Sequence, residues 1–125
     1  MRYLSLDLGS KHVGVAISHE GQIVLPLATV KPFQIVSVIN QYHPDILVIG
    51  QPTSGPLFQA ALTLKQNLEK QFSLKIILHP EDFSSRIGAQ KLVEGNFSRS
   101  KRQNSRHQAA AAVILQDFLD SLCYN

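Results

Sequence analysis

The first 30 residues contain three short strand-like segments separated by tight turns, and this arrangement limits the fold more than any other feature of the chain. Residues 2–8 alternate between apolar and other side chains with a period of two, as a half-buried strand does. Residues 12–18 and 22–30 also read as strands, and the turns lie around Gly9 and Gly21. Because turns this short join antiparallel neighbours, we predict a three-stranded antiparallel meander.

The rest of the chain alternates between helix-like and strand-like segments. Strands separated by helices pair in parallel with right-handed crossovers, so we expect two parallel strands to join the meander in one mixed five-stranded sheet flanked by helices. Pro26 cannot donate to a strand ladder, which predicts that the third strand lies at a sheet edge. We expect strands at 45–50 and 74–78, helices at 33–42, 57–72, 84–93 and 108–122, and a polar loop at 95–105.

Length and composition favour a globular protein of one domain spanning residues 1–125. Apolar residues make up 44% of the chain and charged residues 17%, which argues against disorder. The single cysteine, Cys123, excludes a disulfide framework and a cysteine-based zinc site. No apolar run approaches the roughly 18 residues that span a bilayer, and the chain begins with a strand pattern instead of a signal peptide. We therefore expect a cytoplasmic protein that does not interact with membranes.

The net charge of +3 is unevenly distributed. The segment 86–106 has six basic residues and one acidic residue, a local charge of +5, whereas the remainder has 6 basic and 8 acidic residues, or −2. Serine and asparagine are interleaved with the basic residues at its end, a composition that suits phosphate contacts as well as a solvated loop. The basic positions indicate a polyanionic partner: Arg86, Lys91, Arg99, Lys101, Arg102 and Arg106.

Asp7 stands within the first predicted strand, where aspartate is disfavoured. It shares a strand face with Tyr3 and Ser5. One interpretation is an edge or solvent-facing residue. The other is a functional carboxylate that binds a metal ion or acts as a general acid or base, since broken local rules often mark sites.

Glu81 and Asp82 directly follow the last predicted strand. In open α/β sheets functional groups gather beyond the carboxyl ends of strands, although either residue could instead cap the next helix. If the first and last strands border one site, Asp7 and Glu81 could share a divalent cation, and hard oxygen ligands suit Mg²⁺ or Mn²⁺.

Two other features have structural interpretations that compete with functional ones. His107 opens the last predicted helix, where a histidine is more often a surface or capping residue than a ligand. The stretch Gly9-Ser10-Lys11 lacks the full phosphate-loop pattern and precedes no helix, so it is better interpreted as a hairpin turn.

Together these motifs resemble the YqgF/RuvX family of proposed pre-16S rRNA nucleases, which are related to Holliday junction resolvases. Residues 6–18 are similar to the family's opening Asp-x-Gly-Thr/Ser-Lys-x-x-Gly-Val-Ala motif. Residues 49–52 are similar to its Val-Gly-Leu-Pro motif, and residues 111–119 to its C-terminal helix. The resemblance covers nearly the whole chain and implies an RNase H-like fold.

The chain departs from the family pattern at the predicted acidic site. The family's Asp-Glu-Arg after the last strand corresponds to Pro80, Glu81 and Asp82, and its Asp at the start of the last helix corresponds to His107. The loop after Pro52 is also shorter by about four residues. The resemblance thus carries over Asp7 and Glu81 but not a third acidic ligand.

The resemblance implies a metal-dependent nuclease acting on structured RNA such as pre-rRNA, with Mg²⁺ or Mn²⁺ at Asp7 and Glu81. His107 departs from the family pattern, and our hypothesis is that it completes the metal site as a third ligand, which would favour Mn²⁺, or acts as a proton carrier. Alternatives are a non-catalytic nucleic-acid-binding module and a Holliday junction resolvase acting on branched DNA. We expect a monomer or a weak homodimer. The phosphate backbone would be held by Lys11, Arg99, Lys101, Arg102 and Arg106.

Overall fold

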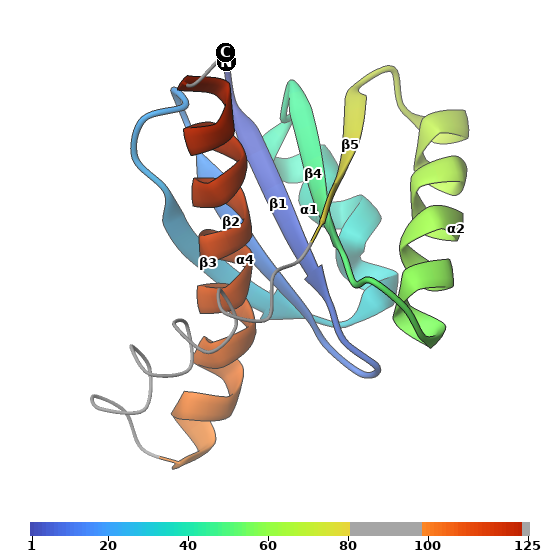
Figure 1. The fold of residues 1–125 in the computed structure, drawn as a ribbon, viewed down its shortest axis with the longest axis vertical. Coiled ribbons are helices and arrows are strands. Elements are labelled where there is room, and N and C mark those ends of the chain that lie inside the picture. Colours follow the sequence, from blue (N-terminus) through green and yellow to red (C-terminus); the bar gives the residue numbers. More distant parts are fainter. Residues whose placement is uncertain (81–98, 124–125) are drawn as a thin grey trace.

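The computed structural model describes the backbone of residues 1–80 and 99–123 and the side chains of residues 1–80 and 106–122. Figure 1 shows a twisted sheet with helices packed on its two faces. The described elements follow one another in this order: β1 (Tyr3–Leu8), β2 (Val13–Ser18), β3 (Leu25–Val30), η1 (Pro32–Gln34), α1 (Ile35–Tyr42), β4 (Ile46–Gln51), α2 (Pro56–Gln71), β5 (Lys75–Pro80) and α4 (Arg99–Cys123).

The five strands form one mixed sheet in the order β3-β2-β1-β4-β5. β1 is central: it pairs antiparallel with β2 and parallel with β4, and β4 pairs parallel with β5. The predicted sheet is therefore confirmed, since the tight turns produce the antiparallel half and the intervening helices the parallel half. β1, β4 and β5 all point in one direction, so their carboxyl ends lie at the same edge of the sheet, the lower edge in Figure 1.

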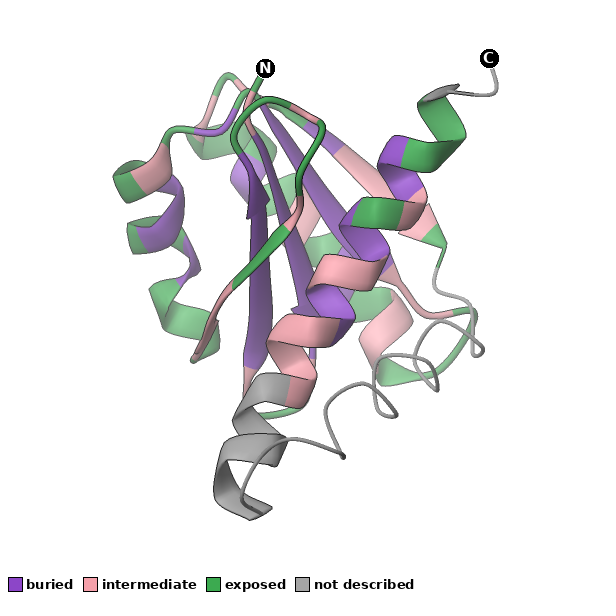
Figure 2. Ribbon diagram, turned by 90° about the vertical axis from the view of Figure 1, so that its left-hand side faces the viewer, coloured by how far each residue is buried: buried purple, intermediate pink, exposed green. Residues whose placement is uncertain are grey.

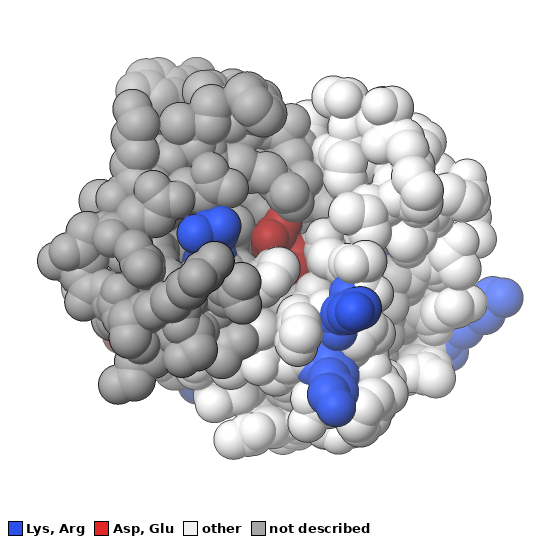
Figure 3. Space-filling model, turned by 90° about the horizontal axis from the view of Figure 1, so that it is seen from below, with Lys and Arg blue, Asp and Glu red and all other residues white. Residues whose placement is uncertain are grey.

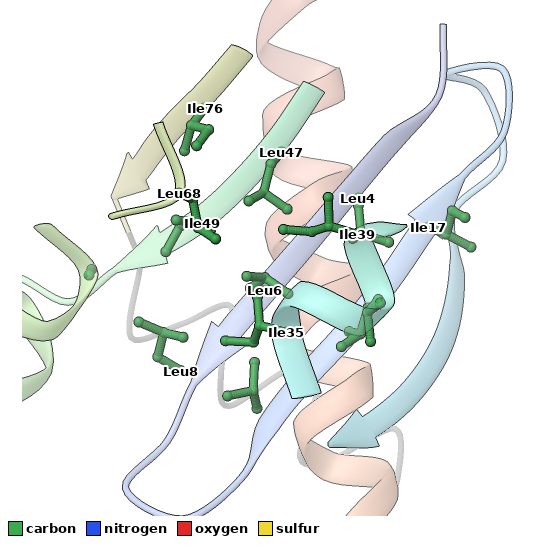
Figure 4. Close-up of a cluster of buried hydrophobic side chains, with 14 residues drawn as sticks. Leu4, Leu6, Leu8, Ile17, Ile35, Ile39, Leu47, Ile49, Leu68 and Ile76 are labelled. Atoms are coloured by element: carbon green, nitrogen blue, oxygen red, sulfur yellow. The ribbon is translucent and has the colours of Figure 1, made fainter. Parts of the chain in front are cut away.

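The two faces of the sheet bury different side chains. Leu4, Leu6 and Leu8 project toward α1 and α2 and join Leu47 and Ile49 in the larger core cluster (Figure 4). The alternate residues of the central strands project toward α4 and form a smaller cluster around Tyr3, Val48, Leu115 and Phe118. Figure 2 shows the sheet buried between these layers. The strict alternation of β1 thus separates an apolar face from one that carries Tyr3, Ser5 and Asp7.

β3 lies at the edge of the sheet, as Pro26 predicts. Its register with β2 shifts between Val15 and Ala16, and Ala16 pairs with Pro26 beyond the shift. An edge strand tolerates a residue that lacks an N–H donor because one of its sides pairs with no other strand.

Several predicted boundaries are wrong. The third strand begins at Leu25 and not at residue 22, and the predicted helix 33–42 divides into a 3₁₀ turn and α1. The predicted helix 84–93 lies outside the described residues.

The largest difference from the sequence-based prediction lies in the segment 95–105, for which the sequence predicts a polar loop. α4 begins at Arg99, so the described part of this segment is helical. Arginine, lysine and glutamine favour helices, but residues 99–105 include no apolar side chain, so no buried stripe marks a helix there.

Within the described ranges, no helix combines the length and apolar character needed to cross a bilayer.

Candidate active site beside the central strand

Asp7 is a buried carboxylate near the carboxyl end of the central strand. Only 3% of its surface is exposed, and strands lie on both sides of β1, so the edge or solvent-facing interpretation is wrong. Its side chain is on the face that α4 covers, two residues from Ser5, whose Oγ donates to the carbonyl oxygen of Ala111 in α4 at 2.7 Å. Because burying a carboxylate costs free energy, Asp7 is a candidate functional residue.

Gly14 lets α4 approach the sheet closely beside Asp7. Gly14 and Asp7 are direct partners across β1 and β2, so a side chain at position 14 would project to the same face as the carboxylate. A Cβ built at Gly14 would overlap the main-chain carbonyl of His107 and lie 2.9 Å from the amide nitrogen of Gln108. The backbone of α4 at His107 therefore rests on β2 next to Asp7.

The His107 imidazole lies over the turn between β1 and β2. Its Cε1 and Nδ1 are 3.4 Å and 3.8 Å from the position that a Cβ of Gly9 would occupy, and its ring centroid is 5.9 Å from that of His12. His107 is half-buried and lies about two turns inside α4. The prediction that it opens the helix is wrong, but Asp7 and His107 do lie at the same end of the same face.

The turn itself is a hairpin, as its sequence indicates. The Gly9 amide donates to the carbonyl oxygen of His12 at 2.9 Å, and Leu8 pairs with Val13. No helix follows it, so it does not form a phosphate loop.

Glu81 and Asp82 lie outside the described residues. Pro80, which precedes them, is the last residue of β5 and pairs with Gln51 at the end of β4. The end of β5 at Pro80 therefore lies at the same edge of the sheet as Asp7.

Two of the five predicted phosphate-binding residues have described side chains. Lys11 is exposed on the β1–β2 turn, and Arg106 is half-buried on α4 beside His107. Arg99, Lys101 and Arg102 fall in the first turns of α4, and their side chains lie outside the description. Figure 3 views the lower end of the molecule and shows an acidic group set back between basic side chains.

The described residues supply only part of a metal site. Among them, no three His, Cys, Asp or Glu side chains gather closely enough to hold a metal ion. Asp7 offers the hard oxygen that Mg²⁺ and Mn²⁺ prefer, and His107 offers a nitrogen that suits Mn²⁺ better. Asp7 and His107 are therefore donors of the types that bind Mg²⁺ or Mn²⁺, and a complete metal site would need at least one further ligand.

A polar pocket of about 370 Å³ opens between α4 and the edge strand β3. The sequence does not predict this pocket, because its residues come from four separate elements and form no motif. The one signal in the sequence is that Lys31 directly follows the third strand and Gln34 comes three residues later. The pocket is lined by His12, Thr29, Val30, Lys31, Gln34 and Gln108.

Comparison with known proteins identifies the family. The sequence model of the RuvX family, described as Holliday junction resolvase, matches residues 1–121. The chain belongs to the RuvX family. The resemblance found in the motifs at residues 6–18, 49–52 and 111–119 is thereby confirmed.

Curated relatives support the RuvX assignment over nearly the full length. A protein of Geobacillus sp. (strain WCH70) named "Putative pre-16S rRNA nuclease" is 35% identical over 136 residues, which cover 97% of this chain and 99% of the relative. A protein of the same name from Bacillus thuringiensis (strain Al Hakam) is 36% identical with the same coverage.

Solved structures confirm the RNase H-like fold expected of a RuvX protein. The Holliday junction resolvase of fowlpox virus has a TM-score of 0.65 at 14% identity, covering 98% of this chain and 99% of that one. T. thermophilus RuvC in complex with a Holliday junction substrate has a TM-score of 0.60 at 15% identity, covering 98% and 96%. At these identities the likeness establishes the shared fold alone.

Proposed function

We propose that this protein is a divalent-metal-dependent nuclease that processes the 5′ end of pre-16S rRNA. The observation that carries the proposal is the buried carboxylate of Asp7, which lies at the carboxyl end of the central strand beside α4 in a member of the RuvX family. The names of its curated relatives support the substrate. The protein would act in the cytoplasm as one domain spanning residues 1–125.

The metal would be held by Asp7, Glu81 and His107. Asp7 and His107 are supported by their common position at the lower end of the α4 face, and Glu81 by its place one residue beyond the end of β5. When bound, Mg²⁺ or Mn²⁺ would activate a water molecule and stabilise the leaving oxygen of an in-line displacement.

The chain's own residues would orient the reaction. Asp7 sits on a strand that pairs on both sides, so its carboxylate is held by a rigid element. The His107 imidazole, whose main chain is fixed against Gly14, would accept or donate a proton if it is not a ligand. The backbone of the substrate would be held with little base recognition by Lys11, Arg99, Lys101, Arg102 and Arg106.

The experiment that tests the activity is a cleavage assay on an RNA that carries the pre-16S 5′ extension, with Mg²⁺, with Mn²⁺ and with a chelator. We expect cleavage that needs a divalent ion. The ratio of the cleavage rate in Mn²⁺ to that in Mg²⁺ should be higher than in relatives that have an aspartate at the position of His107. Cleavage unaffected by the chelator would contradict the metal dependence.

A non-catalytic nucleic-acid-binding module is the second candidate. It is favoured by His107, which stands at a position where the family pattern has an acid. This candidate predicts salt-sensitive RNA binding with no cleavage in either metal.

A Holliday junction resolvase is the third candidate, favoured by the description of the RuvX family. It would act on a branched DNA and would need a dimer that presents two sites to the junction. A four-way DNA junction in the same assay, together with sedimentation at working concentration, distinguishes it from an RNA nuclease that is a monomer or a weak dimer.

A further inference from the structure

The polar pocket beside β3 lies in line with Asp7 across the sheet. Asp7 pairs with Gly14, and Gly14 pairs in turn with Thr29 in the pocket wall. Two strand spacings separate Asp7 from Thr29, or about 10 Å. Because the backbone of α4 rests on Gly14 between them, the carboxylate and the pocket lie on opposite sides of the same helix.

The pocket wall offers hydrogen-bond donors and no carboxylate. It includes the Lys31 ammonium, the His12 imidazole and the side-chain amides of Gln34 and Gln108, and it has no Asp or Glu. Lys31 and Gln34 are exposed, whereas His12 and Gln108 are half-buried, so hydrogen-bond donors lie both at the mouth of the pocket and deeper in its wall. A site of this composition favours an anion with several acceptor oxygens.

The orientation of the Gln34 amide is fixed by the backbone. The main-chain N–H of Lys31 donates to Oε1 of Gln34 at 2.8 Å. Since an N–H group needs an acceptor, the oxygen of the amide must face Lys31, and the NH₂ group is left to donate elsewhere. Gln34 is therefore a preoriented donor at the pocket.

We propose that this pocket, formed by Lys31, Gln34, His12 and Gln108, binds a backbone phosphate of the RNA strand whose cleavage depends on Asp7. The inference rests on the proposed nuclease function and adds to it a phosphate contact on the β3 side of α4. A phosphate held here, on the other side of α4 from Asp7, would help to fix the direction of the strand across the helix.

The first test examines the pocket without any cleavage. We would titrate ¹⁵N-labelled protein with inorganic phosphate and, separately, with chloride at the same ionic strength. The proposal predicts that the side-chain amide resonances of Gln34 and Gln108 shift and saturate with phosphate only. Absent shifts, or shifts equal to those with chloride, would overturn it.

The second test uses a substitution that keeps the local structure. In Gln34→Glu the carboxylate can still accept from the Lys31 amide, but a donor is replaced by a negative charge. We expect severalfold weaker binding of a fluorescent single-stranded RNA. Gln66→Glu makes the same change at an exposed position of α2, on the other face of the sheet, and should bind like the parent protein.

Salt dependence then isolates the phosphate contact. Lys31→Gln should reduce the slope of log K against log salt by about 0.7, the value for one phosphate on a single strand, whereas Lys70→Gln on α2 should not change it. All binding is measured in an Asp7→Asn background without divalent ions. A reduced slope in Lys31→Gln, together with no cleavage by the parent protein, would support phosphate binding in the pocket and reject the nuclease function. An unchanged slope in Lys31→Gln, together with cleavage that depends on Asp7, would reject phosphate binding in the pocket and support the nuclease function.

Discussion

Gly14 lies directly against the main-chain carbonyl of His107, and this contact fixes α4 on the sheet beside Asp7. A glycine is required here because a methyl group would occupy the same space as the carbonyl oxygen and carbon. The contact sets the position of His107 and also of the next residue, Gln108, which lines the polar pocket.

Gly14→Ala should therefore destabilise the protein by about 2 kcal/mol or more, since overpacking a tight contact forces the backbone apart. Urea denaturation monitored by circular dichroism measures the loss. Gly55→Ala is the control: its Cβ would meet nothing within 4 Å, but its positive φ of 90° makes alanine cost about 1 kcal/mol. Equal stability of the Gly14→Ala and parent proteins would show that α4 is not held as described.

Ser5→Ala should cost about 1 kcal/mol, because it removes the buried hydrogen bond from Ser5 Oγ to the Ala111 carbonyl. The exposed Ser54 provides a matched control, and Ser54→Ala should change the free energy of unfolding by less than about 0.5 kcal/mol. A Ser5→Ala variant as stable as the parent would mean that this bond contributes nothing to docking of the helix.

Phe118→Ala should destabilise the protein by about 3–5 kcal/mol. The Phe118 ring is 7% exposed, and its centroid lies 6.1 Å from that of Tyr3 and 6.0 Å from that of His79. Leu122→Ala, at a position 45% exposed on the same helix, should have a much smaller effect. Thermal unfolding measures the loss of stability in both variants. A larger loss in Leu122→Ala than in Phe118→Ala would contradict the described packing of α4.

His107→Asp should shift the metal preference of cleavage toward Mg²⁺, because it replaces an imidazole nitrogen by a hard oxygen ligand. The ratio of the cleavage rates in Mg²⁺ and Mn²⁺ measures the shift. His19→Asp makes the same change at an exposed residue after β2 and should leave the ratio unaltered. An unchanged ratio in His107→Asp would exclude His107 as a ligand.

The sheet could be predicted from the sequence because its determinants are local. The period of two in residues 2–8, the turn at Gly9 and the proline at position 26 each act within a few residues, and together they define strand directions and one edge. The start of α4 could not be predicted in the same way, since residues 99–106 have helix-forming side chains but no apolar stripe.

The candidate site, too, could be predicted only where its features depend on the local sequence. Asp7 could be singled out because it breaks the pattern of a strand. The contact of Gly14 with His107 depends on how closely a distant helix approaches the sheet, and the pocket of His12, Lys31, Gln34 and Gln108 depends on four elements meeting. Such contacts between distant segments leave no periodic signal in the sequence.

The central claim is that cleavage depends on the buried carboxylate of Asp7, and Asp7→Asn tests it most directly. The rate of single-turnover cleavage of the pre-16S RNA is compared for the parent protein, Asp7→Asn and Asp120→Asn, which makes the same change at an exposed site on α4. We predict that Asp7→Asn lowers the rate at least about 100-fold while the fold is retained, and that Asp120→Asn has no effect. Undiminished divalent-dependent cleavage by folded Asp7→Asn would contradict the account.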